Sequence, residues 1–178
     1  MRKLALCLVL LLSVAIAGIA QDTPKDIQSR CVGTWAVDLA ASDYGKMPPP
    51  KSATLHVTKC SPDAIAYTYS EVGADGKKYQ ETWSGKPDGK MMPAKTVPAT
   101  PEKNSFKWDG DVLLGEFDMG PEGTATEHNS FSEDGKTMTT KRAGKSPKGE
   151  YSITQVWHRK SGIGTPKKAI GKPNAGKQ

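Results

Sequence analysis

The chain has 178 residues, of which 36% are hydrophobic and 25% charged, and a formal net charge of +6. The charge is unevenly distributed: residues 159–178 hold six basic side chains and no acidic one, whereas residues 21–158 are slightly acidic. The acidic character of residues 21–158 argues against specific nucleic-acid binding, because domains with that function usually carry a basic face on the folded part.

The first 20 residues resemble an export signal. Arg2 and Lys3 precede an almost wholly apolar run, residues 4–20, which ends in small residues at the spacing that signal peptidase recognises. We therefore predict a cleaved signal peptide over residues 1–20, a mature chain starting near Gln21, a secreted or periplasmic location and no transmembrane anchor. A retained anchor is the alternative, because the run is of marginal length for a membrane span.

Two cysteines, Cys31 and Cys60, remain after cleavage. Cys31 lies just before the first predicted strand and Cys60 just after the second, so an antiparallel pairing brings both to one end of the sheet. Export to an oxidising compartment favours a disulfide between them. A free reactive thiol is the alternative.

Apolar and polar residues alternate through residues 33–39, 52–59, 65–69 and 79–83, the period of a half-buried strand. The faces that we expect to point inward carry Trp35, Val37 and Leu39; Ala53, Leu55 and Val57; Ile65, Tyr67 and Tyr69; and Tyr79, Glu81 and Trp83. Residues 21–30 are predicted to be a polar lead-in, and no segment predicts an amphipathic helix.

The stretch 86–102 interrupts this rhythm with four prolines, at positions 87, 93, 98 and 101. Proline does not fit a central strand, so we predict a long connection or a frayed edge strand. A lid or an entrance loop would also suit this stretch.

Strands resume at residues 104–108, 111–118, 123–132, 136–144 and 149–158. Val112 and Leu114 share one parity and Phe117 has the other, which predicts a β-bulge at Gly115 and places Glu116 and Asp118 in water. Four Asp-Gly pairs, beginning at residues 75, 88, 109 and 134, predict tight hairpins with type I′ turns. The fold class is therefore all-β: an antiparallel up-and-down meander of about 8–10 strands, closed into a barrel.

Gly33-Thr34-Trp35, at the start of the first strand, resembles the opening motif of the lipocalin and wider calycin group. That resemblance implies a basic residue on the last strand that packs across the tryptophan, and Arg159 is the nearest candidate. The Asp-Gly-Lys triplets at 75–77, 88–90 and 134–136 are similar to those of secreted lipocalin-like proteins of soil bacteria, whose roles are mostly unknown. The likeness covers about residues 31–160 and implies a lipocalin-like barrel domain over residues 21–160.

No catalytic or phosphate-binding motif is present, so we expect neither an enzyme nor a cofactor. The three histidines, His56, His128 and His158, are expected at the surface, which disfavours a metal or haem site. Glu116 with Asp118 as an acid–base pair is the weaker alternative to a solvated strand face.

The aromatic residues are the better functional candidates. We predict that Tyr67, Tyr69, Trp83 and Trp108 line an interior cavity, and that Arg142 receives a ligand carboxylate there. The expected function is binding of a small apolar or amphipathic ligand. The alternative is a non-enzymatic, envelope-associated interaction protein with a solid core.

Residues 161–178 are rich in Gly, Pro and Lys and have almost nothing to bury. We predict a disordered basic tail. Weak contact of this tail with an anionic envelope surface is a further expectation.

Overall fold

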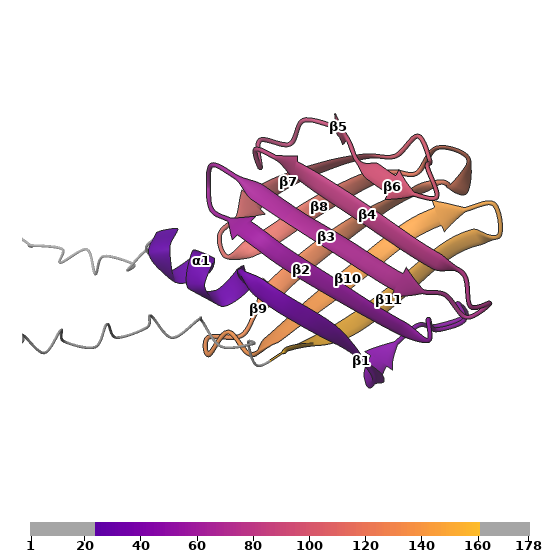
Figure 1. Cartoon of the computed structure of the whole chain (residues 1–178), viewed down its shortest axis with the longest axis horizontal. Helices are drawn as coiled ribbons and strands as arrows, with labels where there is room; N and C mark the ends of the chain where they lie inside the picture. The colour runs from indigo at the N-terminus through magenta and orange to yellow at the C-terminus, as the bar shows by residue number, and fades with distance from the viewer. Residues whose placement is uncertain (1–23, 161–178) are drawn as a thin grey trace, which may run out of the picture.

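The computed structural model of the chain describes residues 24–160. The predicted signal peptide and the predicted basic tail therefore lie outside the described residues. The described part contains eleven strands, one α-helix and one 3-10 helix (Figure 1). In chain order they are α1 (Pro24–Cys31), β1 (Gly33–Asp43), β2 (Ser52–Cys60), β3 (Ile65–Val72), β4 (Lys78–Gly85), β5 (Met92–Pro93), β6 (Lys95–Val97), β7 (Lys103–Asp109), β8 (Val112–Asp118), η1 (Gly120–Glu122), β9 (Thr124–Phe131), β10 (Thr137–Ser146) and β11 (Gly149–Arg159).

All strands belong to one antiparallel sheet with the order β5-β7-β8-β9-β10-β11-β1-β2-β3-β4-β6. In Figure 1, β1–β4 form the front wall, and β7–β11 cross behind them. The last strand pairs with the first, with Trp35 opposite Arg159 and Val37 opposite Trp157. The barrel is nearly closed, with one seam between the β5–β7 edge and the β4–β6 edge. The predicted all-β antiparallel fold is confirmed.

The proline-rich stretch explains why the predicted strand count is too low. Within it, β5 pairs with β7 on one side of the seam, and β6 pairs with β4 on the other. Both strands are short, two and three residues, because proline supplies no N–H to a ladder. The stretch is thus a connection that carries a short strand on each side of the seam.

The Asp-Gly turns differ in type from the prediction. The four glycines have positive φ angles, Gly76 +85°, Gly89 +77°, Gly110 +58° and Gly135 +63°, but no other kind of described residue does. A type I′ turn needs positive φ at both central positions, so that turn type is wrong. The aspartates hold the turns differently: the carboxylates of Asp75 and Asp134 each accept the backbone N–H two residues on, at 3.0 Å.

The bulge predicted at Gly115 is also wrong. The β7–β8 and β8–β9 ladders pass through Gly115 without a register shift, and the inward residues of β8 are Leu113, Gly115 and Phe117. A Cβ atom on Gly115 would lie 2.9 Å from Phe117 Cε2 and 3.0 Å from Phe106 Cε1. This glycine therefore makes room for two aromatic rings and leaves the strand's register unchanged. Glu116 is exposed, as predicted.

Helix α1 replaces the predicted polar lead-in and closes one end of the barrel. The guanidinium of Arg159 donates to the carbonyls of Ser29 and Arg30 in the last turn of the helix, and to that of Val32. It also lies over the ring of Trp35, 4.6 Å from the centroid. A cation at a helix C-terminus satisfies carbonyls that have no partner within the helix, so Arg159 joins the last strand to α1.

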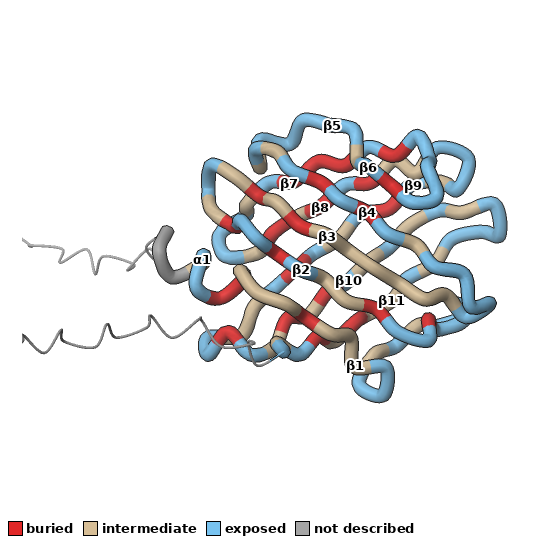
Figure 2. Tube along the Cα trace, viewed as in Figure 1, coloured by how far each residue is buried: buried red, intermediate tan, exposed pale blue. Residues whose placement is uncertain are grey.

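The disulfide between Cys31 and Cys60 fastens the same end, with the two Cα atoms 6.2 Å apart. Trp35 is fully buried beneath it and donates its indole N–H to the carbonyl of Cys31 at 3.0 Å. Figure 2 shows buried residues along the barrel walls and exposed residues in β5 and most loops. No helix within residues 24–160 is long and apolar enough to cross a bilayer.

Candidate functional site

The barrel interior contains a cavity of about 500 Å³ that is partly open to solvent. Strand β1 starts at α1 and runs away from it, so the lining residues of the following loop, Tyr44, Met47, Pro48 and Pro50, lie at the end opposite the helix. The apolar part of the wall consists of Leu55, Val57, Ile65, Phe106, Phe117, Met119, Ile153 and Trp157. Volumes of this size are usual for small-molecule sites.

The polar part of the lining is rich in tyrosines and carboxylates. All five tyrosines of the chain line the cavity: Tyr44, Tyr67, Tyr69, Tyr79 and Tyr151. Five glutamates also line it: Glu71, Glu81, Glu102, Glu122 and Glu127. Arg142 is the only basic side chain among the described lining residues.

One hydrogen-bonded group centres on Glu81 and spans the seam. The Oε1 atom of Glu81 accepts hydrogen bonds from the Tyr67 hydroxyl and from Asn104 Nδ2, the second with a donor–acceptor distance of 2.5 Å. Asn104 Nδ2 is also 3.0 Å from the hydroxyl oxygen of Tyr67. Glu81 lies on β4 and Asn104 on β7, and these strands share no ladder. Side chains therefore connect the two edges where backbone pairing is interrupted.

The Tyr79 hydroxyl extends this group to Glu102. It lies 2.6 Å from Glu102 Oε2 and 3.2 Å from Glu81 Oε2. Burial raises the pKa of Glu81 above its usual value, because the charged form loses its hydration. Burial and the nearby Glu81 carboxylate likewise raise the pKa of Tyr67 well above its usual value. The hydroxyls of Tyr67 and Tyr79 thus stay protonated at neutral pH and act as donors to the carboxylates.

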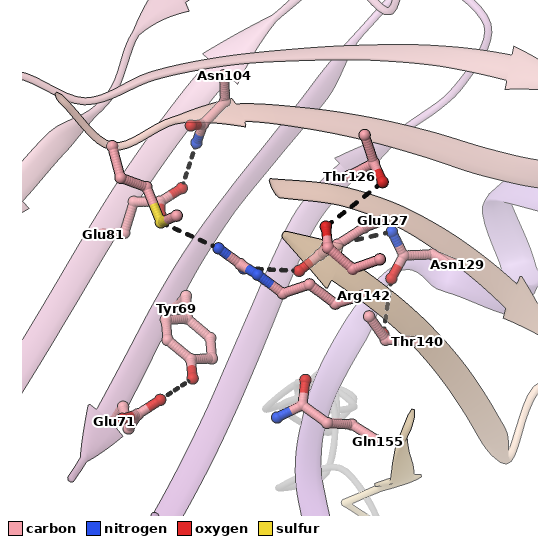
Figure 3. A network of polar contacts seen from close by, with 12 residues as sticks. Tyr69, Glu71, Glu81, Asn104, Thr126, Glu127, Asn129, Thr140, Arg142 and Gln155 are labelled. Carbon is pink, nitrogen blue, oxygen red and sulfur yellow. Dashed lines mark hydrogen bonds and ion pairs between the residues drawn. The ribbon is translucent and has the colours of Figure 1, made fainter. Parts of the chain in front are cut away.

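A second group surrounds Arg142 on β10, shown in Figure 3. Its Nη1 lies 2.8 Å from Glu127 Oε1, its Nε donates to the Tyr151 hydroxyl at 3.3 Å, and its Nη2 lies 3.2 Å from the sulfur of Met119. Its guanidinium also lies 4.7 Å from the Phe117 centroid. Burial acts to lower the pKa of Arg142, but the Glu127 carboxylate, together with the Tyr151 hydroxyl, outweighs it and raises that pKa. Arg142 is permanently charged and held by protein partners.

Three of the predicted cavity residues, Tyr67, Tyr69 and Arg142, lie in the lining, whereas Trp83 and Trp108 do not. Trp83 is 1% exposed and packs against Phe106 with ring centroids 4.8 Å apart. Trp108 is half-buried and donates its indole N–H to the Ser61 carbonyl at 3.2 Å, in the β2–β3 loop. Both tryptophans lie outside the cavity wall.

The carboxylates are the residues that the sequence-based reasoning missed as site members. Glu81 falls between Tyr79 and Trp83 on a face predicted to point inward, and Glu71 follows Tyr69 with the same parity. A charged residue on the strand face that is predicted to be buried could have identified both as site residues. Glu102 and Glu127 had no such signal, because the first precedes its strand and the second lies in a mostly polar one.

The described part of the chain offers little other site chemistry. His56, His128 and His158 are exposed. Within residues 24–160, no three His, Cys, Asp or Glu side chains lie close enough together to hold a metal ion.

No family model matches the sequence, and no curated protein is found to be similar. Solved structures are similar in fold. A variant of the fluorescent protein UnaG aligns with a TM-score of 0.51 and 11% identity over 75% of this chain and 99% of that one. Zebrafish ileal bile acid-binding protein, complexed with cholic acid, aligns with a TM-score of 0.49 and 11% identity, over 74% of this chain and 99% of that one. Rv2717c from M. tuberculosis aligns with a TM-score of 0.48 and 18% identity, over 75% of this chain and 94% of that one. The chain has a calycin-type β-barrel fold.

Proposed function

We propose that this protein is an exported binding protein that holds one small apolar or amphipathic molecule inside its barrel. The observation that carries the proposal is the cavity of about 500 Å³ between the two walls. An apolar wall next to a few fixed polar groups is the usual composition of a small-molecule site. A solid-core interaction protein, the alternative, would fill this volume with side chains.

The lining supports binding rather than catalysis. The Arg142 guanidinium and the Glu81 carboxylate are each held in a fixed position by neighbouring side chains. Such fixed groups orient a ligand without reacting with it.

Titration with the neutral fluorophore N-phenyl-1-naphthylamine tests this proposal. We expect enhanced fluorescence with one site per chain, because the naphthyl group leaves water for the apolar wall. Ile153→Trp narrows the cavity and should abolish the enhancement. The control is Ser152→Trp, on the same strand but exposed. Equal binding by both variants, or no binding by the wild type, would contradict the proposal.

The export part of the proposal is supported by the leader sequence and by the Cys31–Cys60 disulfide. N-terminal sequencing of protein from a fractionated host should find a mature chain beginning near Gln21 outside the cytoplasm. A cytoplasmic chain that retains residues 1–20 would refute export and leave the binding proposal standing.

A further inference from the structure

The cavity lining carries more negative than positive charge. Arg142 and Glu127 neutralise each other at 2.8 Å, which leaves Glu71, Glu81, Glu102 and Glu122 without a basic partner among the described lining residues. Carboxylates that are withdrawn from water are costly unless a counter-charge or hydrogen bonds compensate. An anionic head group would add to this cost, whereas a cationic one would reduce it.

The hydrogen-bonding capacity that remains in the cavity is mainly that of acceptors. A tyrosine hydroxyl has one proton to donate. Tyr67 donates its proton to Glu81, Tyr69 to Glu71 and Tyr79 to Glu102. What these groups still offer a ligand is lone pairs on hydroxyl and carboxylate oxygens. A head group with N–H donors fits such a wall.

A buried acceptor without a partner lies beside two residues of the lining. Asn104 is fully buried on the inward face of β7, and its Nδ2 bonds to two lining residues, Tyr67 and Glu81. Its Oδ1 atom accepts no hydrogen bond. On the lining itself, the indole N–H of Trp157 is the one buried donor without a partner within residues 24–160, and it carries no charge.

Arg142 does not reverse this balance. Its Nη1 and Nε are held by Glu127 and Tyr151, and its plane lies on Phe117. Its Nη2 contacts only the sulfur of Met119, but a ligand carboxylate bound there would lie beside Glu127 and compete with it for one counter-charge. The tyrosine rings add to the preference for a cation, because the faces of aromatic rings attract positive charge.

We propose that the ligand of this cavity is an amphipathic cation, an ammonium group carried on an apolar body. This inference rests on the proposed function, since it specifies the charge of the molecule that the barrel binds. The ammonium group lies among the tyrosine oxygens and the lining carboxylates of Glu71, Glu102 and Glu122. The apolar body lies against Leu55, Phe117 and Ile153.

Three probes that share one chain separate charge from hydrophobicity: decylammonium, decan-1-ol and decanoate, each below its micelle concentration. Displacement of N-phenyl-1-naphthylamine measures their binding. We expect decylammonium to bind at least about tenfold more tightly than decan-1-ol, because one hydrogen bond to a charged group is enough to produce a difference of that size. Decanoate should bind most weakly.

Two variants locate the effect. Glu71→Gln and Glu122→Gln should each weaken decylammonium binding about tenfold or less and leave decan-1-ol unchanged. Glu122 is exposed, so its variant tests the inference even where Glu71→Gln fails to fold. The control is Glu133→Gln, at an exposed turn, which should alter neither probe.

The outcomes distinguish the two proposals. Equal binding of the three probes, preference for decanoate, or unchanged decylammonium binding in both cavity variants would overturn the cationic assignment while the binding function stands. Failure of the fluorophore and of all three probes to bind would instead overturn the proposed function.

Discussion

Glu81 receives more hydrogen-bond donors than any other carboxylate described above, although its side chain is almost inaccessible to solvent. Tyr67 and Asn104 donate to one of its oxygens, and the Tyr79 hydroxyl lies 3.2 Å from the other. The hydrogen bond from Tyr67 favours the ionised form, but the cost of burial is larger and raises the pKa. The protonation state of this one residue therefore affects the stability of the fold.

The stability of the wild type should fall relative to that of Glu81→Gln as the pH rises above about 4.5, the usual pKa of glutamate. Because the folded state has the raised pKa, it binds a proton in a pH range where the unfolded chain has released one. The contribution is therefore fully present below that pH and is lost as the pH rises through the folded-state pKa. Urea denaturation at several pH values measures it. A constant or rising stability of the wild type relative to the variant would contradict the assignment.

At the scale of elements, α1 depends on a residue far away in the sequence. Its eight residues are too few to form a stable helix alone, and Arg159 satisfies its last carbonyls. The helix, Trp35 and the last strand therefore form one structural unit at the closed end of the barrel.

Replacing Arg159 with methionine keeps the aliphatic stem and removes the donors. We expect a loss of about 2–4 kcal/mol in the free energy of unfolding, because several carbonyls lose a charged donor. Lys160→Met, at the adjacent exposed residue, is the matched control and should change stability little. Urea denaturation of both variants decides the matter, and equal stabilities would refute the role assigned to Arg159.

The seam is the other feature at this scale. Three residue pairs join β6 to β4, and two join β5 to β7, whereas eight join β9 to β10. Asn104 adds the side-chain link to Glu81 across the gap.

Asn104→Leu keeps similar volume and removes that link. We expect a loss of about 2 kcal/mol, because Glu81 and Tyr67 each lose a buried partner. Amide hydrogen exchange should accelerate in residues 80–82 and 95–97 and stay unchanged in β9 and β10. Uniform acceleration throughout the barrel would show that the seam is not a separate opening unit.

At the scale of the whole molecule, strand alternation in the sequence predicts the barrel well. Ala53 and Val57, and Tyr67 and Trp83, are buried on the faces that their parity indicates. Gly115 misled the prediction because its small size accommodates Phe106 and Phe117, a contact that local sequence does not reveal. Helix α1 was missed for a similar reason, because Arg159, which satisfies its last carbonyls, lies about 130 residues away in the sequence.

The site was predictable only in part. Tyr67, Tyr69 and Arg142 follow from residue type and parity, and they do line the cavity. Trp83 has the inward parity but lies beyond the cavity, where rings pack against one another. A two-residue period shows which side chains point inward, but it does not distinguish those that border the cavity from those that pack against other rings.

The most direct test of a hollow, ligand-binding barrel is isotope-filtered NMR with decan-1-ol, which does not depend on the charge of the ligand. We predict nuclear Overhauser effects between the decyl chain and the methyl groups of Leu55, Val57 and Ile153, which line the cavity. Contacts only with the exposed side chains of Leu39 and Val97 would contradict it, because they would place the ligand on the outer surface.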